Sequence, residues 1–202
     1  MSAVAACPEK PIKPGVGMAI IPVRGYVLGM KHLSAFLCLL VGLLVGLWVA
    51  PSQAAEPQLI KTFKDWDAFT LGEGASKKCY VASMASKKSP ANVRHGDVYM
   101  TVAHKPRRKV VDEVNIVVGY DFKSGSNIRV TSGSTSESLF SSGREAWAYD
   151  PAMDGRLVAA MKRGSKMAVS GTSSRGTRTN YEFSLMGFSA AYDAISKACK
   201  IG

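Results

Sequence analysis

Histidine and cysteine are scarce in this chain of 202 residues, which has three of the first and four of the second. No two cysteines form a CxxC pair, and no GxSxG segment marks a nucleophilic serine. Structural zinc sites need closely spaced ligands, and a catalytic triad needs a histidine held between a serine and an acid. The sequence therefore predicts no metal, no cofactor and no catalytic residue. A hydrolase that uses His95 or His104 with a serine or an aspartate is the alternative.

Acidic side chains are also in deficit. The 15 aspartates and glutamates face 26 lysines and arginines, which gives a formal net charge of +11. Residues 1–54 hold four of the basic and one of the acidic side chains, leaving 22 and 14, or +8, in residues 55–202. A basic surface favours anionic partners. We expect an envelope or host-surface partner such as an anionic glycan or lipid, with no specific nucleic acid; a basic protein without an anionic partner is the alternative.

Charge is absent altogether from the eighteen residues Leu33–Ala50. The short positive segment Met30–His32 precedes this apolar run, and the small residues Ser52 and Ala54 follow it. This order is typical of a secretory signal peptide. We therefore expect a signal peptide over residues 30–54 and a periplasmic, outer-membrane-associated or secreted protein. An uncleaved membrane anchor is the alternative, because a run of about this length could just span a bilayer.

Three segments follow from this assignment. Residues 1–29 fit no targeting element and are interpreted as a translation start placed too early or as an extended leader. Residues 55–202 are interpreted as one mature domain. Only Cys79 and Cys199 remain in that domain. Exported proteins pair their thiols, so the sequence predicts a disulfide between them, which would stabilise the domain by about 4–5 kcal/mol in the chain-entropy model.

Short apolar stretches between glycine, serine and asparagine turns predict an all-β, antiparallel, sandwich-like fold. The expected strands are 78–84, 98–103, 110–120, 128–131, 138–141, 146–149, 166–171 and 181–185. Residues 55–61 are expected to form a short leader, and residues 85–95 a polar loop. Helical spacing of apolar residues predicts two short helices, over 154–163 and 188–198. Gly164 is expected to end the first helix and Ser189 to cap the second.

Basic residues gather at two places between the expected strands. The first is Arg107, Arg108 and Lys109, and the second is Arg175 and Arg178. Both are candidate anion-binding sites, although charges at strand ends also serve only to solvate and protect a sheet edge. The second cluster lies in a glycine-rich segment that lacks the GxxxxGK[ST] order of a phosphate-binding loop.

Several short motifs follow one another in a characteristic order over about residues 63–199. They are FxDW at 63–66, CY at 79–80, DVY at 97–99, a strand at 113–120 ending in GY, LVAAMKxG at 157–164, SGxS at 170–173, RGT at 175–177 and FSLxGFSAA at 183–191. In order and spacing they resemble the invasion-associated locus B (IalB) family of alphaproteobacterial exported proteins.

The resemblance implies a signal-bearing, β-sandwich-like envelope or secreted protein, in a family named for host-cell invasion by a pathogenic member. It implies no established catalytic residues. We therefore expect a non-enzymatic exported envelope protein that aids host-cell interaction or invasion by binding an anionic or protein partner. A periplasmic structural or chaperone-like envelope factor is the alternative.

Overall fold

A computed structural model describes residues 55–201 of the chain. Within these residues, eleven strands and two helices follow one another in an all-β arrangement with short 3-10 turns. The strands are β1 (Gln58–Phe63), β2 (Trp66–Leu71), β3 (Lys78–Met84), β4 (Lys87–Ser89), β5 (Tyr99–Lys105), β6 (Val110–Val117), β7 (Asn127–Ser132), β8 (Thr135–Ser142), β9 (Glu145–Trp147), β10 (Lys166–Thr172) and β11 (Arg178–Ser184). The helices are α2 (Pro151–Arg163) and α3 (Phe188–Cys199), and the 3-10 turns are η1 (Gly74–Ser76) and η2 (Pro106–Arg108).

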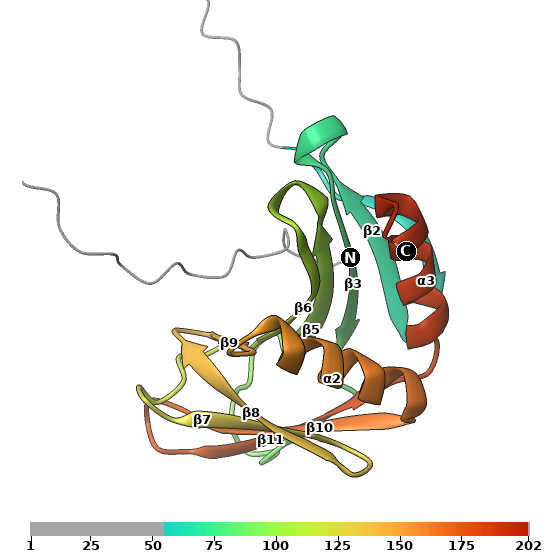
Figure 1. Ribbon diagram of the computed structural model, residues 1–202. Helices are drawn as coiled ribbons and strands as arrows, with labels where there is room; N and C mark the ends of the chain where they lie inside the picture. The colour runs from blue at the N-terminus through green and yellow to red at the C-terminus, as the bar shows by residue number, and fades with distance from the viewer. Residues whose placement is uncertain (1–54, 202) are drawn as a thin grey trace, which may run out of the picture. The chain divides into compact units, whose positions relative to one another are not determined.

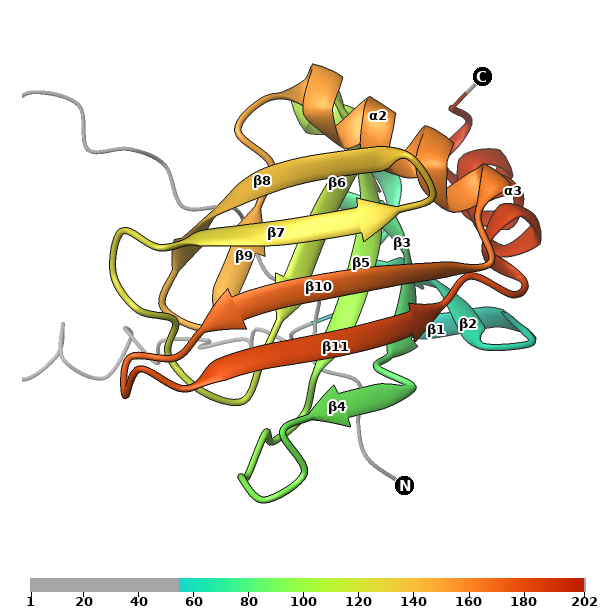
Figure 2. The same ribbon diagram turned by 90° about the horizontal axis from the view of Figure 1, so that it is seen from below.

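All neighbouring strands are antiparallel and form one sheet in the order β1-β2-β3-β5-β6-β9-β8-β7-β10-β11-β4. The sheet folds over on itself. β2, β3, β5 and β6 form one layer, and β7, β8, β10 and β11 form the other (Figures 1 and 2). The predicted sandwich-like, all-β fold with two short helices is therefore confirmed.

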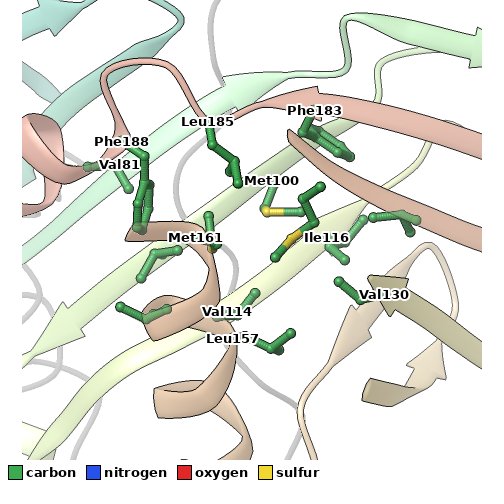
Figure 3. Packing of buried hydrophobic residues seen from close by; sticks show 14 of the residues in the cluster. Val81, Met100, Val114, Ile116, Val130, Leu157, Met161, Phe183, Leu185 and Phe188 are labelled. Atoms are coloured by element: carbon green, nitrogen blue, oxygen red, sulfur yellow. The ribbon is translucent and has the colours of Figure 1, made fainter. Parts of the chain in front are cut away.

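The core lies between the two layers and beneath the two helices. α2 packs against β6 and β8, and α3 packs against β1, β2 and β3. Alternate residues of the strands point inward, as the pleat of a strand requires, and each fully buried large side chain contributes about 1.5–3 kcal/mol of transfer free energy. Figure 3 shows the cluster, which includes Met100, Val114, Ile116, Val130, Leu157, Met161, Phe183 and Phe188.

The helix ends partly follow the sequence prediction. α2 begins after Asp150, whose side chain accepts a hydrogen bond from the N–H of Met153 at 2.8 Å, and it ends at Gly164 as predicted. α3 begins two residues earlier than a Ser189 cap would allow, because Gly187 is the N-cap. Gly187 has φ +93°, and a Cβ there would collide with the backbone carbonyl of Phe63. The prediction of Ser189 as the cap was therefore wrong: its hydroxyl donates instead to the carbonyl of Lys162 at 3.4 Å.

Three strands were missed in the sequence. Residues 55–61 contain most of β1, and residues 85–95 contain β4. β2 is the third missed strand. No residue of β1 is buried, so the strand shows no inward alternation that could be recognised. β4 is only three polar residues long and exists because it pairs with β11.

The predicted disulfide is present. Cys79 in β3 and Cys199 at the end of α3 are bonded, with their Cα atoms 5.9 Å apart. Both side chains are buried in the main core. The bond therefore fixes the last turn of α3 onto the centre of one layer.

No helix among residues 55–201 is long and apolar enough to cross a membrane. The predicted signal peptide over 30–54 and the segment 1–29 lie outside the described residues.

Candidate anion-binding site

A pocket of about 610 Å³ opens where four connections of the sandwich meet. Its walls come from residues 93–95 before β5, residues 119–121 after β6, Arg144 in the β8–β9 turn, and residues 173–175, 177 and 179 of the β10–β11 hairpin. This volume lies in the range of small-ligand sites. We call it the arginine pocket, because Arg94, Arg144 and Arg175 all line it.

The charges of the arginine pocket are unequal. Three guanidinium groups share it with one carboxylate, that of Asp121. Arg144 Nε lies 3.8 Å from Asp121 Oδ1, and both side chains are about two-thirds exposed. Among the described residues, no ion pair involves Arg94 or Arg175. The pocket therefore offers planar, permanently charged donors of the kind that bind carboxylate, sulfate or phosphate groups.

Two glycines bring the walls of the pocket together. The N–H of Gly119 donates to the carbonyl of His95 at 3.1 Å. A Cβ at Gly119 would lie 2.5 Å from that carbonyl oxygen and 2.6 Å from Cα of Gly96. The loop before β5 and the exit of β6 can therefore touch only because neither glycine carries a side chain.

A chain of hydrogen bonds passes through three residues that line the arginine pocket, His95, Tyr120 and Thr179. His95 Nε2 lies 2.8 Å from the carbonyl oxygen of Pro90, and Nδ1 lies 3.0 Å from the hydroxyl of Tyr181. The imidazole also meets the Tyr181 ring edge to face. His95 is thereby fixed between the β4–β5 loop and β11.

The same chain continues through three hydroxyl groups. The hydroxyl of Tyr181 lies 2.9 Å from that of Tyr120, which lies 2.6 Å from Oγ1 of Thr179. Thr179 Oγ1 lies 3.3 Å from the carbonyl oxygen of Gly171. Burial, together with the hydrogen bond to Tyr120, raises the pKa of Tyr181 above its usual range, so its hydroxyl keeps its proton. We call these groups, from Pro90 to Gly171, the hydroxyl chain.

A comparison with protein-family models matches residues 66–196 to the family described as "Invasion associated locus B (IalB) protein". The chain belongs to the IalB family. A search of curated proteins and a search of solved structures each give no match. The matched residues include every residue that lines the arginine pocket. The resemblance inferred from the ordered motifs is confirmed.

In this IalB-family chain, the predicted basic residues do not form one site. Arg175 lines the arginine pocket, whereas Arg178 is exposed at the start of β11 and does not line it. Arg107, Arg108 and Lys109 lie in and after η2, at the opposite end of the β5–β6 hairpin. The sequence therefore found one of the three pocket arginines.

Arg94 and Arg144 were missed. Neither has another lysine or arginine within five positions, so no local cluster marks it. They meet Arg175 only because the sheet order places the β8–β9 turn and the β10–β11 hairpin beside the loop before β5. An arginine set assembled from three distant loops has no signal in local composition.

The predicted hydrolase alternative finds its nearest match around His104. His104 Nε2 lies 3.2 Å from Oγ of Ser196, and His104 Nδ1 lies 3.9 Å from Oδ1 of Asp112. However, Nδ1 accepts a hydrogen bond from the backbone N–H of Asp112 at 3.2 Å, so the ring proton is on Nε2. Nε2 then donates to the serine, whereas a catalytic base must accept the serine proton. This arrangement argues against a Ser-His-Asp mechanism at His104.

His95 offers no better geometry for such a mechanism. Both of its ring nitrogens are taken up by the hydroxyl chain, and neither contacts a serine or a carboxylate. The two histidines also lie apart, since only His95 lines the arginine pocket. Within residues 55–201, no group of three histidine, cysteine, aspartate or glutamate side chains could hold a metal ion.

The burial of His104 predicts acid destabilisation. Desolvation lowers the pKa of His104, and the nearby Asp112 carboxylate only partly offsets this effect. The folded state therefore binds a proton less readily than the unfolded chain, whose histidines titrate near pH 6.5. The stability contributed by neutral His104 is complete above about pH 6.5 and is lost as the pH falls toward the lower folded-state pKa. Urea unfolding at several pH values measures this loss.

The variant His104→Gln isolates this contribution. An amide can accept from the N–H of Asp112 and donate to Ser196, but it does not titrate in this range. We expect the wild-type protein to lose more stability than the variant between about pH 7.5 and pH 5. Parallel pH profiles for the two proteins would contradict the assignment.

Proposed function

We propose that this IalB-family protein is exported to the bacterial envelope and binds an anionic group of its partner in the arginine pocket, without catalysing a reaction. Family membership supports an exported protein, and the family's description supports a role in invasion or host-cell interaction. The observation that carries the proposal is the convergence of Arg94, Arg144 and Arg175 on one concave site with a single carboxylate.

The concave shape is what distinguishes this site from the general positive charge of the protein. An isolated exposed charge contributes about 1 kcal/mol or less to an ion pair, because water and salt screen it. Several guanidinium groups aimed at one anion give charge-assisted hydrogen bonds of about 1.5–3 kcal/mol each. The pocket volume of about 610 Å³ also lies in the range of small-ligand sites, so it has room for a charged group of a larger molecule. We infer that its partner is an acidic glycan.

Removing two pocket arginines tests this proposal. In the variant Arg144→Gln/Arg175→Gln, we expect the affinity for a sulfated polysaccharide to fall about tenfold or more, because at least one charge-assisted hydrogen bond is lost. Affinity is measured at low salt by the salt concentration that elutes the protein from an immobilised sulfated polysaccharide and by titration calorimetry. Lipopolysaccharide and vesicles of anionic phospholipid serve as the two other ligands, which distinguish a glycan from a lipid headgroup.

The variant Arg107→Gln/Lys109→Gln is the matched control. It removes the same net charge from the opposite end of the β5–β6 hairpin. We expect it to retain nearly all of the wild-type affinity. Equal losses in both double variants would mean that binding follows net charge rather than the pocket. Absence of binding by the wild-type protein to all three ligands would overturn the proposal.

A further inference from the structure

The two ends of the hydroxyl chain determine how many hydrogen atoms its hydrogen bonds need. Both ends are backbone carbonyl oxygens, those of Pro90 and Gly171, which accept hydrogen bonds and cannot donate them. Five hydrogen bonds connect these ends. Each hydroxyl group between them carries one hydrogen, so the three hydroxyls supply three of the five. The remaining two must come from the imidazole of His95.

Neutral His95 carries one ring hydrogen and leaves the hydroxyl chain one bond short. The hydrogen on Nε2 is needed for Pro90, so Nδ1 then carries none. Tyr181 donates to Tyr120, and Thr179 donates to the carbonyl of Gly171, so no hydrogen is left between Nδ1 and the hydroxyl of Tyr181. Doubly protonated His95 donates from Nε2 to Pro90 and from Nδ1 to Tyr181, which supplies the fifth bond.

Charged side chains line the pocket around His95. Arg94, Arg144 and Arg175 line the same pocket as His95, and Asp121 supplies the one carboxylate there. On β4, Lys88 Nζ donates to the carbonyl of Gly96, next to His95, at 2.7 Å. Four positive groups therefore face one negative group around an almost fully buried imidazole. An anion held by the arginines would bring negative charge into the pocket that His95 lines, and a nearby negative charge favours the protonated form of an imidazole.

We propose that the arginine pocket binds its anion together with a proton, which His95 takes up at Nδ1 and donates to the hydroxyl of Tyr181. This inference rests on the proposed function and specifies binding further: the site takes up one proton along with the anion. Linkage is reciprocal, so the proton strengthens anion binding by the same factor by which the anion strengthens proton binding. The affinity for an anion therefore rises as the pH falls, by up to tenfold per pH unit for one linked proton.

Inorganic sulfate is the probe, because it keeps its double negative charge over this pH range. Titration calorimetry of the full-length protein at about pH 5.5, 6.5 and 7.5 measures the affinity for sulfate. Repeating each titration in two buffers of different protonation enthalpy gives the number of protons taken up per sulfate bound. We expect between zero and one proton, with a maximum inside this pH range, and an affinity about three- to tenfold higher at pH 5.5 than at pH 7.5.

Two variants locate the proton. His95→Gln has no titrating ring, and Tyr181→Phe breaks the hydroxyl chain beside His95. We expect both to bind sulfate with little proton uptake and a flat pH profile, whereas His104→Gln keeps the wild-type uptake. Ring nitrogen NMR of the wild-type protein is independent of any variant: sulfate should bring both His95 nitrogens to the protonated shift.

The outcomes separate this inference from the proposed function. Sulfate binding without proton uptake, or with equal affinity at all three pH values, would overturn the inference and leave anion binding in the pocket intact. Proton uptake that persists in His95→Gln would overturn it as well. No sulfate binding at any pH would overturn both.

Discussion

Replacing both Cys79 and Cys199 with alanine is expected to lower the free energy of unfolding by about 4–5 kcal/mol. The bond joins residues 120 positions apart, so its loss frees a loop that includes most of the sandwich. In the chain-entropy model, the stabilisation by a disulfide grows with the logarithm of loop length. Urea unfolding of the purified protein, monitored by tryptophan fluorescence, measures the change.

The reduced wild-type protein is the control for this variant. Reduction removes the covalent bond without changing the side-chain positions that the core must fill. We expect the reduced protein and the double variant to agree to within about 1 kcal/mol, because both cysteines are small and alanine leaves only a small cavity. A double variant as stable as the oxidised wild type would show that the unfolded chain gains little freedom when the bond is absent.

Replacing Trp66 with alanine is expected to lower the free energy of unfolding by about 3–5 kcal/mol. The indole is fully buried and packs edge to face on Phe188, with ring centroids 4.9 Å apart. Its Nε1–H also donates to the carbonyl of Ser184 at 2.9 Å, which connects β2 to the end of β11. Truncation removes the aromatic contact and leaves that carbonyl without its indole donor.

The variant Trp66→Phe separates the two contributions. Phenylalanine keeps most of the apolar contact with Phe188 but has no N–H for Ser184. We expect it to lose about 1–3 kcal/mol, the range for an unmade buried hydrogen bond. If both variants were equally destabilised, the hydrogen bond rather than the packing would dominate at this position.

The sequence predicted the central strands because their own residues carry the pattern. In β10, Met167 and Val169 point into the core between polar or small neighbours, and this alternation is visible without a structure. β1 and β4 show no such alternation, since their pairing depends on partners elsewhere in the sheet. The prediction of the α3 cap failed for a related reason. Position 187 must be glycine because a Cβ there would collide with the carbonyl of Phe63, which is 124 residues away in the sequence.

The candidate site was less predictable than the fold. Arg175 could be selected because a second arginine lies three positions away in the same hairpin. The other pocket arginines are recognised only after the sheet order is known. The hydroxyl chain is similar: Tyr120, Thr179 and Tyr181 occur in strand-like or turn-like contexts, and nothing local indicates that their hydroxyls meet His95.

The pairing of β4 with β11 has a consequence for the order of folding. Lys88 pairs with Tyr181, so this part of the sheet joins segments that are more than ninety residues apart. Pairings of long sequence separation form slowly, because loop-closure entropy must be overcome before the contacts can compensate for it. The loop that carries Arg94 and His95 directly follows β4, and His95 contacts Tyr181 of β11, so we expect this pairing to position the loop late in folding. A partly folded chain therefore lacks one wall of the arginine pocket, and the capacity to bind an anion there is a property that only the completed fold acquires.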